Sequence, residues 1–330
     1  MPETTHPALR VGLILGERFT LSAFANFVDV LRLAADEGDR SRPIRCRWSV
    51  LSSDMAPVRS SCGVSVGPNE RLGDASRFDY VVVVGGLLDD VGRLAPEYAA
   101  FLHRAAAAGI PLVGLCTGAF LLHDAGLMQG YRCCVSWFHH EDFLERFDGI
   151  EPVSDRIFVV DRDRLTCSGG ASAAHLAAHL VDRHIGTSAA RKSLHILIID
   201  DAMPADEPQP ILPSDLHTRD PLVRRAILHM QQHMDSAPSV TRIAEAMEVS
   251  RRKLERHFLR AIALTPSEAF LRLRLSQARL LLETSGRTVT EIAAETGFCD
   301  ASHLARVFRE REGVTPDAWR RSTARSTAQA

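Results

Sequence analysis

Hydrophobic and polar positions change their spacing about two thirds of the way along this 330-residue chain. Before that point, short runs of branched apolar residues alternate with longer stretches in which apolar residues recur every three or four positions. The short runs are typical of buried parallel strands, and the longer stretches are typical of amphipathic helices. Because strands and helices alternate, the pattern predicts an α/β domain with a parallel sheet covered on both faces.

The boundaries of these elements follow from where each run begins and ends. We expect strands at Val11–Leu15, Trp48–Leu51, Tyr80–Val84, Leu112–Leu115, Phe158–Val160 and Leu165–Cys167. We expect helices at Leu21–Ala35, Ala95–Ala108, Ala119–Ala125, His140–Arg146 and Ala171–His184.

A proline-rich stretch separates this region from a helical one. Residues 203–219 hold four prolines and little periodicity, as a linker does, and the chain is helical from there to its end. We therefore expect an α/β domain at 1–202, a linker at 203–219 and an all-α domain at 220–330.

The all-α domain contains an internal repeat. A pattern that begins at Ile243 and ends at Phe258 returns from Ile292 to Phe308, and in each copy a Thr-Pro pair follows. Each copy predicts two helices joined by a tight turn. The expected helices are Val240–Met247 with Arg251–Ala261, and Val289–Thr296 with Ala301–Arg311, joined by a long helix at Ser267–Glu283.

Capping residues stand at the expected helix ends. Ser250 and Asp300 each precede the second helix of a copy, as N-caps do. Thr288 and Glu291 have the spacing of a capping box, and Gly297 suits the left-handed residue that ends a helix. Both copies therefore predict a helix-turn-helix unit.

The second helix of such a unit enters the major groove of DNA, where Arg pairs with guanine and Ser or His reads base edges. The joining helix of 17 residues spans roughly 25 Å, which suits major-groove faces about 34 Å apart. The part of the chain from 221 onward holds 18 Lys and Arg against 12 Asp and Glu, whereas the rest is acidic. We expect DNA contacts from Ser250, Arg251, Arg252, Arg256, Ala301, Ser302, His303, Arg306 and Arg309.

A helical bundle for protein contact is the alternative, but it leaves the agreement of repeat, caps and arginines unexplained. Residues 221–321 resemble the DNA-binding domain of AraC/XylS-type regulators. The resemblance rests on Gly297-Phe298, Ser302-His303, Phe308-Arg309 and Gly313-Val314-Thr315-Pro316, with Cys299 and Leu304 as minor departures.

The α/β domain carries one chemically suggestive motif, Gly114-Leu115-Cys116-Thr117-Gly118, where a strand runs into a helix. It has the form of a nucleophile elbow with cysteine at its centre. The N-terminus of the next helix is expected to lower the pKa of Cys116. Gly85 and Gly86 would face the same crevice at the carboxyl ends of the strands.

With this elbow, residues 10–187 resemble the flavodoxin-like fold of class I glutamine amidotransferases and PfpI-type proteins. Joined to an AraC-type domain, it resembles the GlxA-like regulators. The resemblance implies a cytoplasmic homodimer that senses a small effector, binds double-stranded promoter DNA, contacts RNA polymerase and activates transcription. It implies no membrane association, cofactor or metal, and the sequence shows no signal peptide.

Catalysis is not expected of the α/β domain. PfpI-type enzymes place a glutamate after the first strand, where residues 19–24 hold no acid, and a histidine where this chain has Ser136. A thiol without a base is poorly equipped for acyl transfer. The alternatives are a cysteine-dependent amidohydrolase or hydratase tethered to DNA, and a redox sensor acting through Cys116.

The expected effector is a nitrogen-containing metabolite: a quaternary amine such as betaine, carnitine or a choline derivative, or an arginine-like compound. A tryptophan beside the elbow suggests a cation–π contact, although Trp137 packing in the core is an equal alternative. The expected ligand-binding residues are Phe19, Gly86, Cys116, Thr117, Trp137 and Phe138.

Overall fold

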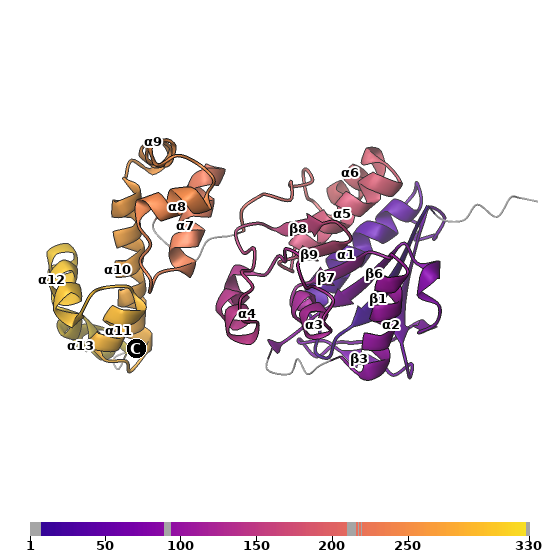
Figure 1. Cartoon of the computed structure of the whole chain (residues 1–330), viewed down its shortest axis with the longest axis horizontal. Coiled ribbons are helices and arrows are strands. Elements are labelled where there is room, and N and C mark those ends of the chain that lie inside the picture. Colours follow the sequence, from indigo (N-terminus) through magenta and orange to yellow (C-terminus); the bar gives the residue numbers. More distant parts are fainter. Residues whose placement is uncertain (1–7, 89–93, 210–215, 217, 219, 328–330) are drawn as a thin grey trace, which may run out of the picture. The chain divides into compact units, whose positions relative to one another are not determined.

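The computed structural model describes residues 8–88, 94–209, 216, 218 and 220–327, the last six by their backbone alone. The chain divides into two compact units, Met1–Gln209 and Pro210–Ala330 (Figure 1). Each unit is described by itself.

A seven-stranded sheet forms the centre of the first unit, in the order β5-β2-β1-β6-β7-β9-β8. The order reverses between β1 and β6, as in a doubly wound fold. The strands are β1 (Leu9–Leu15), β2 (Cys46–Ser52), β5 (Glu70–Arg71), β6 (Tyr80–Val84), β7 (Leu112–Leu115), β8 (Phe158–Asp161) and β9 (Arg164–Cys167). The predicted α/β fold is confirmed.

The prediction of a wholly parallel sheet is wrong for one strand. β8 pairs with β9 in antiparallel register, Phe158 opposite Cys167 and Asp161 opposite Arg164. Only two residues join these strands, which is enough for a hairpin but far too few for a parallel crossover. Arg162 makes the turn at a φ of +55°.

Helices cover both faces of the sheet because the central strands are apolar on both sides. Val82 and Val84 of β6 pack into the core beneath α1 (Leu21–Ala35), α5 (Ser172–His184) and α6 (Thr187–Ile196). Val81 and Val83 pack into a second core. That core lies beneath η1 (Ala75–Arg77), α2 (Pro96–Ala107), α3 (Gly118–Asp124) and α4 (His140–Arg146), with η3 (Trp137–His139) preceding α4.

The prediction missed α6 and a small hairpin, β3 (Val58–Arg59) with β4 (Ser65–Val66). It also assigned the residues after Met203 to the linker. Those residues pack on the first unit: the Gln209 side chain donates to the carbonyl oxygen of Val135 at 2.8 Å, and its oxygen accepts from the Trp137 amide at 2.8 Å. Of the rest of the predicted linker, 210–215, 217 and 219 lie outside the described residues.

The second unit is helical over the part that the structure describes, and its helices match the predicted repeat. Their bounds are α7 (Pro221–Gln232), α8 (Val240–Ala246), α9 (Arg251–Ile262), α10 (Pro266–Thr284), α11 (Val289–Glu295), α12 (Ala301–Glu312) and α13 (Pro316–Thr327). The caps are those predicted. Ser250 accepts from the Lys253 amide and Asp300 from the His303 amide, while Thr288 and Glu291 form a capping box.

Each helix-turn-helix unit has its own apolar core, and α10 contributes to both. Phe270 and Leu273 pack in the first core with Leu254 and Phe258. Four residues of the same helix, Leu275, Ala278, Leu281 and Leu282, pack in the second core. The 19 residues of α10 make it about 28 Å long, so one rigid element carries both units.

The turn between α11 and α12, in the second helix-turn-helix unit, is fixed in two ways. Gly297 adopts a φ of +67°, and a Cβ there would lie 2.2 Å from the carbonyl oxygen of Met234, so only glycine fits. From α10, Arg274 donates to the carbonyl oxygens of Thr296 at 2.7 Å and Gly297 at 2.5 Å, with its guanidinium 4.0 Å from the centre of the Phe298 ring. These contacts join the second turn both to α10 and to the segment after α7, where Met234 packs against the core of the first helix-turn-helix unit.

Candidate functional site

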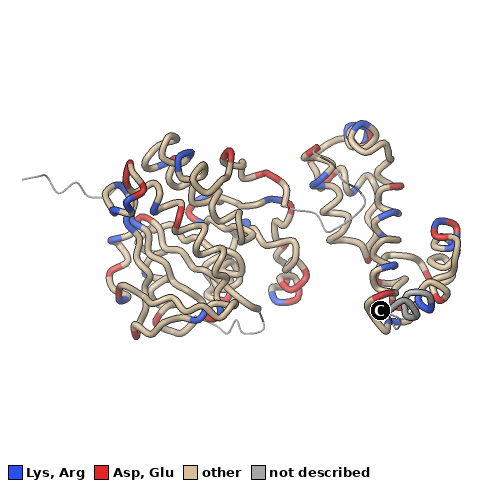
Figure 2. The backbone as a smooth tube through the Cα atoms, turned by 180° about the vertical axis from the view of Figure 1, so that it is seen from behind, with Lys and Arg blue, Asp and Glu red and all other residues tan. Residues whose placement is uncertain are grey.

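The second helices of the two units present basic side chains. On α9, Arg251, Arg252 and Arg256 are exposed, and Leu254 and Phe258 turn inward to hold the helix. Figure 2 shows Lys and Arg residues along this helix and along α12. The Nε atom of Arg251 lies 2.8 Å from a carboxylate oxygen of Glu255, a surface pair that a phosphate or a base can replace at small cost.

On α12 the predicted DNA contacts are exposed to different degrees. Ser302, Arg306 and Arg309 are exposed, whereas Ala301 and His303 are half-buried. The ring of His303 packs edge-on against Phe298 at 5.3 Å, which ties it to the turn. Arg306 pairs with Glu310 at 3.1 Å, again at the surface.

Ser250, also predicted as a DNA contact, is exposed at the start of α9. Its hydroxyl oxygen accepts from the backbone amide of Lys253. The hydroxyl hydrogen is not needed for that cap, so it can donate to a phosphate oxygen.

The elbow has the predicted geometry, but the pKa of its thiol is raised and not lowered as predicted. Cys116 sits between β7 and α3 with a φ of +56°, and its Sγ lies 3.4 Å from Oγ1 of Thr20. Gly169 closes over it, because a Cβ on Gly169 would lie 2.9 Å from that sulfur. Burial raises the pKa of Cys116, which outweighs the hydrogen bond from Thr20 and the amide of Thr117.

The start of α3 lowers the pKa of Cys116 as expected, through the amide of Thr117, but burial outweighs this effect and the net shift is upward. The expectation of a lowered pKa is therefore wrong for the net shift alone. Thr20, which the sequence analysis did not single out, takes the position beside the sulfur. Its place directly before the helix after the first strand is the feature that could have identified it.

The other predicted ligand-binding residues fall into two groups. Thr117 is buried and donates its hydroxyl to the carbonyl oxygen of Gly86 at 2.7 Å, close to Cys116. Phe19 is fully buried in the core, so its side chain meets no ligand. Trp137 is half-buried on η3 and Phe138 is 68 % exposed, their rings 5.7 Å apart and nearly perpendicular.

The two histidines that follow Trp137 and Phe138 have different partners. His139 pairs with Asp142 at 2.7 Å, whereas His140 is buried with Ser154 at 2.7 Å. Within the described ranges, no group of three or more His, Cys, Asp or Glu side chains is arranged to hold a metal ion.

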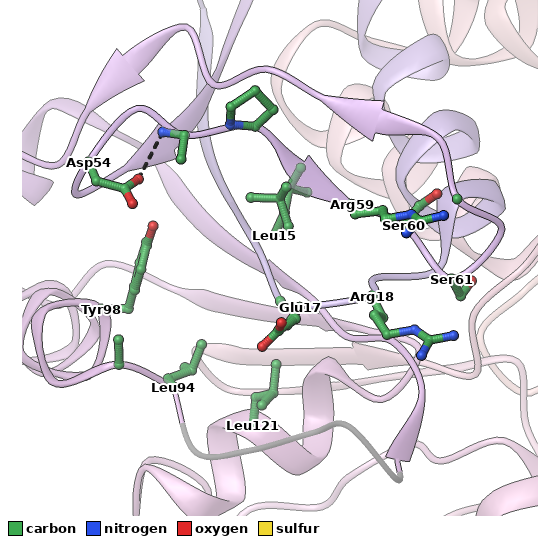
Figure 3. A pocket seen from close by; sticks show the side chains of 16 residues that line it. Leu15, Glu17, Arg18, Asp54, Arg59, Ser60, Ser61, Leu94, Tyr98 and Leu121 are labelled. Carbon is green, nitrogen blue, oxygen red and sulfur yellow. Dashed lines mark hydrogen bonds between the residues drawn. The ribbon is translucent and has the colours of Figure 1, made fainter.

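The first unit also contains a cavity of about 750 Å³ at the carboxyl end of β1 (Figure 3). Its lining includes Glu17, Asp54, Arg59 and Tyr98, which come from three separate segments of the chain. None of the predicted ligand-binding residues lines it.

Comparisons with known proteins agree with this arrangement. Residues 10–183 match the model of the DJ-1/PfpI family, and residues 243–322 match that of a helix-turn-helix domain. The chain is 31 % identical over 317 residues to the HTH-type transcriptional regulator GbdR of Pseudomonas aeruginosa. The matched stretch covers 96 % of this chain and 84 % of GbdR. This chain belongs to the GlxA-like family of AraC-type transcriptional regulators.

Two further proteins are similar to this chain. The HTH-type transcriptional regulator GlxA of Rhizobium meliloti is 27 % identical over 317 residues, covering 94 % of this chain and 95 % of GlxA. The crystal structure of an AraC family transcriptional regulator from Pseudomonas putida is 31 % identical. It covers 57 % of this chain and 99 % of its own, with a TM-score of 0.49.

The family assignment confirms the predicted resemblance and fold class, and it makes this chain a DNA-binding regulator. Among the described residues, no helix is both long and apolar enough to cross a membrane.

The raised pKa of Cys116 predicts slow alkylation. Near neutral pH, iodoacetamide should modify Cys116 at least about tenfold more slowly than Cys62, because the thiolate is the reactive form. Cys62 is an internal control: it is exposed, and the hydroxyl of Ser60 lowers its pKa. Peptide mass spectrometry over a pH series gives both rates, and the Cys116 rate should rise only above the ordinary thiol pKa. Faster modification of Cys116 than of Cys62 near neutral pH would contradict this account.

Proposed function

We propose that this protein is a transcription activator that reads promoter DNA with both helix-turn-helix units. In this proposal the α/β domain dimerises and binds a small nitrogen-containing metabolite, and the bound state changes how the DNA-binding domains are presented. Two observations carry the proposal. Two arginine-bearing helices are joined by one rigid helix, and the elbow holds a half-buried thiol whose pKa is raised by burial.

The dimensions of the second unit support reading of consecutive major grooves. The axis of α10 is about 28 Å long, and the half-widths of the two units bring the span close to the 34 Å that separates adjacent major-groove faces. Exposed arginines on α9 and α12 suit contacts with guanine edges and phosphates.

The chemistry of the elbow supports sensing in place of catalysis. Acyl transfer needs a thiolate and a group that moves protons. Burial raises the pKa of Cys116, and its side-chain neighbour is the hydroxyl of Thr20, which is not basic near neutral pH. The named relatives are transcriptional regulators.

The DNA-reading part predicts a distinct effect for Arg306→Ala. If Arg306 pairs with guanine, discrimination at one base position falls by about 1–3 kcal/mol. Competition binding with operator variants, selected from random DNA with the full chain, measures this. Arg47→Ala removes the same charge from an exposed position in the other unit and serves as the control. An Arg306→Ala protein with unchanged affinity and unchanged base preference removes Arg306 from the interface.

The sensing part predicts that a metabolite changes operator affinity. Amino acids, guanidines and quaternary ammonium compounds, betaine, carnitine, choline and arginine among them, are tested with the full chain on the selected operator. At least one should change Kd by about tenfold, within the usual range of coupling free energies. It should also raise transcription by RNA polymerase from a template carrying the operator. A chain whose affinity and transcriptional output respond to none of these compounds does not fit the proposal.

A further inference from the structure

The cavity at the end of β1 lies where ligands bind in doubly wound sheets. β1 has β2 on one side and β6 on the other, and the order of strands reverses between β1 and β6. In such sheets the crevice outside the carboxyl ends of the strands, at that reversal, is the usual ligand site. Leu15, Gly16 and Glu17 bring the end of β1 into the cavity wall.

One end of the cavity carries negative charge beside an aromatic ring. Asp54 and Tyr98 lie there, and the close-up shows the side chain of Glu17 in the middle of the cavity, between Tyr98 and Arg18 (Figure 3). Asp54 accepts from the Ala56 amide and from the Ser52 hydroxyl, each at 2.9 Å, and these bonds lower its pKa, so it is ionised near neutral pH.

Tyr98 is held in place at the same end. Its hydroxyl accepts from the amide of Ser53 at 3.2 Å and donates to the hydroxyl of Ser52 at 3.3 Å. A fixed phenol ring beside two carboxylates is a suitable site for an organic cation, because ring face and carboxylates both attract positive charge.

The other end of the cavity is basic. Arg18 and Arg59 lie there with Ser60 and Ser61, away from Asp54 and Tyr98 (Figure 3). Arg18 has a φ of +50°, and its carbonyl oxygen accepts from the Leu87 amide at 3.3 Å, which fixes the loop after β1. In the part of the chain that the structure describes, Glu17 and Arg59 make no side-chain hydrogen bond or ion pair with other residues, so both charges are available to a ligand.

The cavity also has apolar walls. Leu15, Leu94 and Leu121 line it, and an aliphatic chain can pack against them. The volume of about 750 Å³ falls within the range of small-molecule sites.

We propose that this cavity is the effector site and that it binds a zwitterion. The cationic group of the ligand lies between Glu17, Asp54 and Tyr98, and its carboxylate lies at Arg59. A short aliphatic chain joins the two groups. This inference rests on the proposed sensing function, and it places the ligand away from the elbow.

Two pairs of probes, whose members differ only in the carboxylate, test it by calorimetry with the full chain. One pair is 4-trimethylammoniobutyrate and butyltrimethylammonium, and the other is 4-guanidinobutyrate and butylguanidine. The variants are Arg59→Gln, which removes the positive charge proposed to bind the carboxylate, and Glu17→Gln, which removes a negative charge proposed to bind the cationic group. Arg47→Gln and Glu37→Gln change exposed residues outside the cavity lining in the same way and serve as matched controls.

At least one zwitterion should bind more tightly than its partner without a carboxylate. Arg59→Gln should weaken binding of the zwitterion by about tenfold, which is the value of one charge-assisted contact. It should also remove the preference for the zwitterion over the compound that lacks the carboxylate. Glu17→Gln should weaken both members of the pair while the preference remains. The control variants should bind as the unchanged chain does. A general loss of structure would weaken binding in both variants alike, whereas here one variant removes the preference for the carboxylate and the other keeps it.

Three results would overturn the inference. In the first, a zwitterion binds but neither cavity variant changes its affinity. In the second, Trp137→Ala weakens it and the cavity variants do not, which places the effector near η3. In the third, neither zwitterion binds. If another metabolite still changes operator affinity, the proposed function stands without this site, whereas the absence of any effector response contradicts both.

Discussion

The placement of the second DNA-reading helix depends on the buried joint between α10 and the second turn. Arg274 donates to the carbonyl oxygens of Thr296 and Gly297, which would otherwise end α11 without partners. Gly297 lets the turn approach the backbone of Met234 more closely than any side chain permits. The joint binds the turn both to α10 and to the segment after α7, which packs on the core of the first helix-turn-helix unit, so α9 and α12 keep one separation. The proposed reading of two successive major grooves requires that this separation is fixed.

The α/β unit keeps the geometry of a nucleophile elbow without its chemistry. A left-handed residue between strand and helix is retained at Cys116, but Gly169 packs on the sulfur and a hydroxyl stands beside it. Burial without a countercharge favours the neutral thiol. At the same edge of the sheet, the loops after β1 and β2 and the start of α2 line a cavity that carries both acidic and basic side chains. The sheet edge used by enzymes for catalysis can thus serve for recognition.

Features set by local patterns could be predicted from the sequence. The bounds of α1 are those expected, and so are the caps of α9, α11 and α12, because helix periodicity and capping depend on neighbouring residues. β8 was placed in a parallel sheet because its apolar run resembles the others, although the two-residue gap before β9 required a hairpin. The cavity could not be predicted: Glu17, Asp54 and Tyr98 are far apart in sequence and meet only in the folded sheet. Arg274 likewise resembles its surface neighbours on α10 until the second turn packs against it.

The most direct test of this account is the response of operator binding to the distance between half-sites. The full chain is titrated against duplexes with two half-sites about 10 bp apart, centre to centre, and against duplexes in which the distance is increased by about half a turn or a full turn. A fixed separation of α9 and α12 predicts that either insertion lowers the affinity to that for a single half-site, because α10 cannot lengthen. Recovery of affinity after insertion of a full turn would contradict the account, since the half-sites would then be read by units that are free to move apart.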